Sequence, residues 1–263
     1  MSEESRNLAE GLHIMQDFIK ISRYAGMRND LAQAGGGNTS FKPDDHIMFV
    51  KSSGVQLAET YYKLYRRQRA QGADGNIVFL ANHGLVVSGE DAEMVIRQTE
   101  HVLQKIAAYL GIDDSLYRNA TRLWSTICQI GLLEDNIIYC SENRYLSQAY
   151  AGAALVEQGL WNHAFCPDCV VYANQKLLRL PKDYDRQDIM DFMEQSGLPT
   201  LIYYEGHFYI LAESVKKAQE IENVMSFAAQ VQYANTGYRM CYLSGDEQGE
   251  LLNWEAEKYR RQK

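Results

Sequence analysis

The chain has 263 residues, of which 46% are hydrophobic and 23% charged, and its formal net charge is −8. This acidic balance argues against general binding to nucleic acid or to acidic membrane surfaces. No apolar run is long enough to span a bilayer and the start of the chain lacks the apolar core of a secretory signal, so we expect a cytoplasmic protein that does not bind membranes. The odd count of five cysteines fits reduced thiols better than a disulfide framework.

The first predicted element is an amphipathic helix over about residues 6 to 25, where apolar side chains recur at helical spacing. The glycine run 35–37 is expected to end this helix. Glycine allows the backbone to approach an anion closely, so the run that ends at Gly37 is a candidate phosphate loop, to which Asn38 and Ser40 would add hydrogen-bond donors. A flexible turn between helix and strand is the alternative interpretation of the same residues.

A hairpin is predicted directly after this loop. Residues 39–41 and 47–51 read as two short strands, and the proline and aspartates at 43–45 favour a reversal between them. The second strand runs into Lys51-Ser52-Ser53-Gly54. Ser53 and Gly54 are candidates for the second half of an anion cradle, for the same physical reasons as the first loop.

A histidine is predicted at a turn between two buried strands. Residues 76–80 and 85–87 are unbroken apolar runs, and Asn82-His83-Gly84 connects them. The neutral imidazole of His83 could bind a metal, or it could simply bond to backbone carbonyls, and the sequence favours neither. A long helix is expected from about 90 to 109, with Gly111 closing it.

The second half partly repeats this plan. Residues 201–204 and 207–211 predict a strand, a turn and a strand, and a helix follows over about 214 to 233. The repeat would place His207 near the position of His83. Between the two copies we predict a hairpin of 170–173 with 176–180 and a helix over 186–195; Ser244 with Glu247 predicts a capping box for a final helix.

Two cysteines stand three positions apart in Cys166-Pro167-Asp168-Cys169, a spacing compatible with a redox or zinc site. A thioredoxin-like site needs a helix after the motif, whereas a strand is predicted here. No second cysteine pair completes a four-cysteine zinc site. We therefore expect Cys166 and Cys169 to be small core residues.

The ordered set of Gly-Gly-Gly-Asn-Thr-Ser, Lys-Ser-Ser-Gly and Asn-His-Gly resembles the class II aldolase/adducin family, closest to its rhamnulose-1-phosphate aldolase-like branch. The resemblance implies an α/β protein with a three-layer α/β/α fold, a mainly antiparallel central sheet and a second, smaller α/β lobe. We expect the aldolase-like domain over residues 1–134 and the second lobe over 135–263. The resemblance also implies a homo-oligomer.

The same resemblance implies a function. Gly37, Asn38, Ser40, Ser53 and Gly54 would bind the phosphate of a small-molecule sugar phosphate. His83 would be one of three histidine ligands to a divalent metal, usually Zn²⁺. The implied reaction is metal-dependent retro-aldol cleavage of a ketose phosphate, of the deoxy-ketose 1-phosphate type.

The sequence departs from the family pattern in one interval. Only residues 55–75 lie where family members carry a catalytic glutamate and a His-x-His pair, and the 263 residues contain no His-x-His. Two explanations stay open: the gene has lost this segment, or the sequence omits it. A protein without it would be a non-catalytic structural or ligand-binding module, as adducin heads are. A nucleotide-dependent oxidoreductase is disfavoured, because residues 35–38 lack the spaced Gly-x-Gly-x-x-Gly turn.

Overall fold

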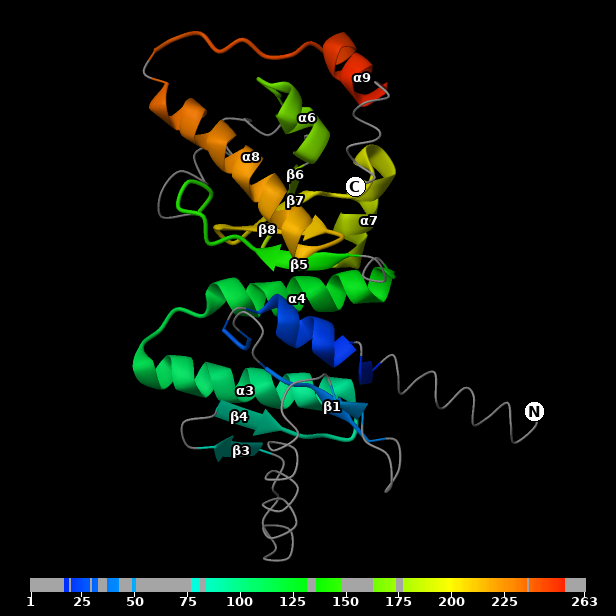
Figure 1. Cartoon of the computed structure of the whole chain (residues 1–263), viewed down its shortest axis with the longest axis vertical. Coiled ribbons are helices and arrows are strands. Elements are labelled where there is room, and N and C mark those ends of the chain that lie inside the picture. Colours follow the sequence, from blue (N-terminus) through cyan, green and yellow to red (C-terminus); the bar gives the residue numbers. More distant parts are fainter. Residues whose placement is uncertain are drawn as a thin grey trace, which may run out of the picture. The chain divides into compact units, whose positions relative to one another are not determined.

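The computed structural model describes residues 17–18, 20–28, 30–32, 37–42, 49–50, 77–80, 84–131, 136–147, 163–173, 177–235 and 237–253. The chain divides into two compact units, Met1–Asp114 and Ser115–Lys263, drawn in Figure 1. Both contain helices and strands, so the protein is of the α/β type. The sequence analysis predicted a boundary after residue 134 and a smaller second lobe. The structure instead divides after Asp114, and its second unit is the longer one.

The first unit contains a helical segment, two antiparallel ribbons and a long helix. Residues 20–27 are helical, which agrees with the predicted first helix, but the helix ends before the glycine run. The pairing of β1 with β2 confirms the predicted hairpin after the glycine loop, and β3 with β4 confirms the strands on either side of Asn-His-Gly. The elements are β1 (Ser40–Phe41), β2 (Phe49–Val50), β3 (Ile77–Leu80), β4 (Gly84–Val87) and α3 (Ala92–Leu110).

Helix α3 begins and ends as its sequence predicts. Asp91 is the N-cap, and its side chain accepts a hydrogen bond from the backbone N–H of Met94 at 2.6 Å. Gly111 ends the helix in the left-handed conformation, at φ 66°, and its N–H bonds to the carbonyl of Ala107. One face of the helix is buried, including Ile96 and Val102.

The second unit is built around a mixed four-stranded sheet in the order β5-β8-β7-β6. Strand β8 pairs antiparallel with both β5 and β7, whereas β6 and β7 are parallel. The elements are α4 (Ser115–Ile130), β5 (Ile137–Cys140), α6 (Pro167–Ala173), β6 (Leu177–Arg179), α7 (Arg186–Ser196), β7 (Leu201–Tyr204), β8 (His207–Ala212), α8 (Val215–Ala234) and α9 (Gly245–Asn253).

Most of the predicted elements of this half are confirmed. Strands β7 and β8 join through a two-residue turn in which Glu205 (φ 45°) and Gly206 (φ 87°) both have positive φ, as a type I′ hairpin turn requires. Helices α7 and α8 follow the predicted ranges closely. The capping box of α9 is present, since Ser244 and Glu247 exchange hydrogen bonds in both directions.

The predicted hairpin of 170–173 with 176–180 is wrong. Residues 167–173 form helix α6, and β6 pairs with β7 in parallel, across the connection made by α7. Val170 and Val171 favour a strand by propensity, but Pro167 suits the first position of a helix, and burial of Val170 beside Ala228 of α8 decides the outcome.

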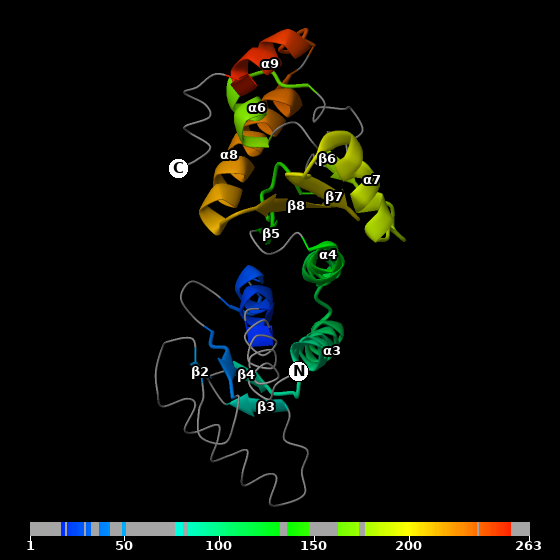
Figure 2. The ribbon, with the colours of Figure 1, turned by 90° about the vertical axis from the view of Figure 1, so that its right-hand side faces the viewer.

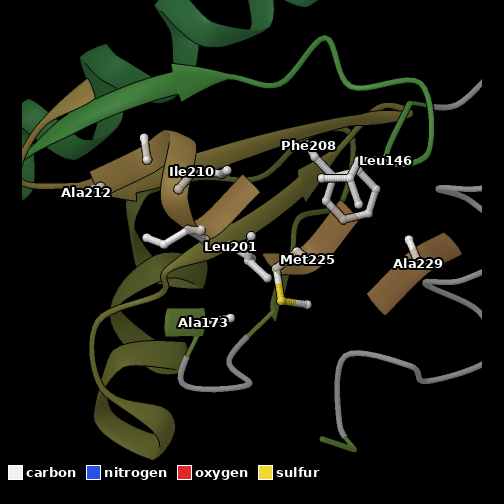
Figure 3. Close-up of a cluster of buried hydrophobic side chains, with 10 residues drawn as sticks. Leu146, Ala173, Leu201, Phe208, Ile210, Ala212, Met225 and Ala229 are labelled. Carbon is white, nitrogen blue, oxygen red and sulfur yellow. The ribbon is translucent and has the colours of Figure 1, made fainter. Parts of the chain in front are cut away.

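Helices cover both faces of this sheet. Figure 2 shows α8 and α7 on opposite sides of the strands, and α4 packs against β5 and α7. Alternate residues of β7 and β8 face α8: Leu201, Phe208 and Ile210 lie in the main hydrophobic cluster with Met225 of α8, as Figure 3 shows. On the other face, the hydroxyl of Tyr209 donates to the carbonyl of Leu116 in α4 at 2.9 Å.

A partly buried carboxylate on α8 bonds to β5 and to the residue that follows it. Glu222 accepts hydrogen bonds from the hydroxyls of Ser141 at 2.6 Å and Tyr139 at 3.1 Å. Burial, and then the negative charge of Glu222, raise the pKa of Tyr139 to about 12.

This shift predicts a pH dependence of stability. The folded-state pKa of Tyr139 lies above the unfolded value of about 10, so its contribution is complete below pH 10 and is lost as pH rises through about 12. The difference in free energy of unfolding between wild type and Tyr139→Phe should therefore shrink over that window in urea titrations. The matched control is Tyr238→Phe, at a side chain that is 82% exposed. Parallel pH curves for wild type and Tyr139→Phe would contradict the prediction.

Candidate functional site

The glycine loop is described from Gly37 onward. Gly37 has φ +78°, a conformation that favours glycine, and a Cβ there would lie 3.1 Å from the Cβ of Ala32. Asn38 and Ser40 are exposed, whereas Thr39 is half-buried and its hydroxyl lies 2.7 Å from that of Ser22. The loop therefore presents two polar side chains to solvent and holds the residue between them against the first helix.

An ionic cluster around a buried arginine anchors the segment that leads into this loop. Arg28 is only 3% exposed. Its guanidinium donates to both carboxylate oxygens of Asp30, at 2.7 and 2.5 Å, and to Glu100 of α3 at 2.5 Å. The hydroxyl of Tyr24 donates to the same Glu100 oxygen at 2.5 Å. We call these four residues the Arg28 cluster; they tie the first helix and the start of the loop to α3.

The charges of this cluster are fixed by its geometry. Burial opposes the charge of Arg28, but Asp30 and Glu100 more than offset it, so the pKa of the guanidinium is raised and the group stays charged. Burial and Glu100 raise the pKa of Tyr24, which keeps its hydroxyl a donor. Because two carboxylates surround one guanidinium, the cluster has no positive charge left for an anion. Any phosphate at the loop would be held by main-chain amides, Asn38 and Ser40.

The remaining predicted site residues lie outside the part of the chain that the structure describes. This applies to Ser53 and Gly54 of the second loop and to His83. Near His83, Leu80 and Gly84 are described and pair with each other. Gly84 has φ +124°, which explains a glycine at that position. The structure thus places Gly37 and Asn38 on one loop and Ser40 at the start of β1 directly after it, and the full anion site stays a prediction.

The predicted metal site finds no ligand set among the described residues. Within these ranges, no group of three histidine, cysteine, aspartate or glutamate side chains could hold an ion. His83 is the one proposed ligand, and three protein ligands are usual for catalytic zinc. Because His83 lies outside these ranges, the metal site stays a prediction, and no catalytic step follows from the described residues.

His207, which the repeat placed near the position of His83, has a different setting. It is the first residue of β8 and pairs with Tyr204 across the two-residue turn. Its Nε2 lies 3.0 Å from the hydroxyl of Ser115, and its ring contacts that of Tyr209. Three residues separate the paired Leu80 and Gly84, whereas two separate Tyr204 and His207, so the two hairpins are not equivalent. The contacts of His207 are those of a structural residue.

The Cys166–Cys169 pair differs from its predicted setting. Helix α6 begins at Pro167, within the motif, and continues to Ala173. The two sulfurs lie 3.3 Å apart, with Cys169 buried at 3% exposure and Cys166 partly exposed. The argument against a redox pair depended on a strand at this place and is therefore wrong. Proline directly after the first cysteine was the sequence signal for the helix.

Comparison with protein families, curated proteins and solved structures gives no match for this chain. No helix within the described ranges is long and apolar enough to cross a membrane.

Proposed function

We propose that this chain is a class II aldolase-like protein that binds a sugar phosphate. The phosphate would be held by Gly37, Asn38 and Ser40 together with Ser53 and Gly54. One observation carries the proposal: a positive-φ glycine is followed by two exposed polar side chains, with Thr39 between them turned onto Ser22. Backbone held in this way can offer N–H groups to an anion without a charged side chain. The fold proposed with it is the three-layer aldolase-like fold.

The activity proposed is reversible retro-aldol cleavage of a ketose phosphate of the deoxy-ketose 1-phosphate type. A divalent metal, Zn²⁺ in the resembling family, would polarise the substrate oxygens during this cleavage. His83 is the one ligand that the resemblance assigns. If the gene has lost the segment that carries the other ligands, further ligands would have to come from a neighbouring subunit of a homo-oligomer.

A second function is favoured by a specific observation. Residues 55–75 leave room for about one helix and two turns, and the chain contains no His-x-His pair. A protein with the phosphate loop but without these groups would be a non-catalytic module that binds a sugar phosphate. This alternative keeps the same anion site and differs only in chemistry.

The anion site is tested by Asn38→Ala and Ser40→Ala. Each change removes a neutral donor to a charged ligand, worth about 1.5–3 kcal/mol, so each should weaken binding of a deoxy-ketose 1-phosphate roughly 10- to 100-fold in calorimetry. Inorganic phosphate serves as a second probe. Asn253→Ala, at an exposed residue near the end of α9, is the matched control and should bind as wild type does. Unchanged binding in both loop variants would refute the placement of the site.

A metal and product assay separates the two functions. If the protein is a lyase, it should hold about one metal ion per chain and form an aldehyde product, and His83→Ala should abolish both. The module predicts sugar-phosphate binding with neither metal nor product. Absence of binding in the wild-type protein would refute both.

A further inference from the structure

The sulfurs of Cys166 and Cys169 lie in one turn at the start of α6. The backbone N–H of Cys169 donates to the carbonyl of Cys166 at 3.2 Å, which closes the turn and directs both side chains toward each other. The sulfurs are 3.3 Å apart, and a disulfide bond measures about 2.05 Å. Formation of the bond therefore requires the sulfurs to approach by only about 1.3 Å.

We propose that Cys166 and Cys169 form a redox-active dithiol that low-molecular-weight disulfides, such as glutathione disulfide, convert into an intrachain disulfide. This pair belongs to the second unit, and the proposed phosphate loop belongs to the first. Neither proposal depends on the other.

The different burial of the two thiols assigns their roles. Cys169 lies in the cluster of Ala164, Val170 and Ala228, and burial, followed by the neighbouring Cys166, raises its pKa to about 12. It therefore stays a protonated thiol that external reagents do not reach. Cys166 is packed at the edge of this cluster and is partly exposed. Cys166 is thus the attacking thiol and Cys169 the resolving thiol.

The reaction balances as two exchange steps. The Cys166 thiolate attacks one sulfur of the glutathione disulfide, which forms a mixed disulfide and releases one glutathione thiolate. Cys169 then loses its proton to the solvent or to the released thiolate, and its sulfur attacks the Sγ of Cys166. This breaks the mixed disulfide and releases the second glutathione. The protein loses two hydrogens and two electrons, and one glutathione disulfide becomes two glutathione molecules.

The test uses the full reduced chain, incubated with glutathione disulfide, quenched in acid, alkylated and mapped by mass spectrometry. Wild type should form a disulfide between Cys166 and Cys169 without retaining glutathione. Cys169→Ala should retain one glutathione on Cys166, at a level roughly tenfold or more above wild type, because the resolving thiol is lost. Cys166→Ser should leave Cys169 unmodified.

Two further variants keep the outcome decisive. Cys241→Ser removes an exposed thiol outside the pair and should oxidise as wild type does. Cys169→Ser replaces Cys169→Ala if circular dichroism shows that the alanine variant does not fold. The proposal is overturned if wild type keeps glutathione on Cys166 without forming the disulfide, if Cys169 reacts in Cys166→Ser, or if neither thiol reacts while Cys241 does.

Discussion

Replacement of Phe208 by alanine should destabilise the second unit by about 3–5 kcal/mol. Phe208 lies on the central strand β8 and is 1% exposed. Its ring packs in the main cluster with Leu201 and Met225 and meets the ring of Tyr203 edge-on at 5.2 Å between centroids. Alanine would lose these contacts and leave a cavity that a sheet packed between helices cannot easily close.

The measurement is urea unfolding followed by tryptophan fluorescence. All three tryptophans of the chain lie in the sequence of the second unit, and Trp124 is buried in α4. Phe227→Ala is the matched control, because Phe227 lies on α8 but is 55% exposed. The same change there should cost about 1 kcal/mol or less. Equal losses in the two variants would mean that Phe208 is not in the core.

Replacement of Arg28 by alanine should have a comparable effect on the first unit, about 3–5 kcal/mol. The reason is electrostatic: the change removes the guanidinium whose positive charge lies between the carboxylates of Asp30 and Glu100. Tyr24 would keep one hydrogen bond to Glu100, which offsets only part of this loss.

Hydrogen exchange of the full chain, read on peptides from α3, reports this effect in the first unit alone. Arg97→Ala is the matched control, since Arg97 is an exposed arginine of α3 and its loss should change protection by about 0.5 kcal/mol or less. Arg28→Ala combined with Glu100→Ala should recover part of the loss, because one of the two carboxylates that faced the guanidinium is then also removed. No recovery in the double variant would argue against the electrostatic explanation.

Local patterns predicted most of the secondary structure. The periodic helices α3, α7 and α8, their caps and the tight turn at Glu205-Gly206 are determined by residues close in sequence. The pattern failed at 170–173, where valines of strand propensity lie in a helix because they pack against α8. Helix α4 was not predicted, although its buried residues Leu123, Trp124 and Ile127 recur at helical spacing. The parallel pairing of β6 with β7 depends on contacts between distant segments, which periodicity does not report.

The candidate sites also combine features that the local sequence predicts with features that only the fold brings together. The positive φ of Gly37 and the exposure of Asn38 and Ser40 agree with a loop predicted from glycine and donor residues alone. The Arg28 cluster had no sequence signature, because Arg28 and Glu100 are far apart in the chain and meet only in the fold. The spacing of Cys166 and Cys169 in the sequence indicated that their sulfurs could meet. Whether the pair was interpreted as a redox motif depended on a helix at this place, which the sequence analysis did not predict.

The position of β5 at the edge beside β8 affects how the chain matures during synthesis. Strands β6 and β7, helix α7 and β8 form a contiguous stretch, whereas β5 precedes them and has β8 as its partner. A ribosome adds about 5–20 residues per second. The apolar segment Ile137–Cys140 is therefore synthesised on the order of ten seconds before its partner strand β8 is complete. During this interval the nascent segment is a binding target for chaperones that recognise extended apolar peptides.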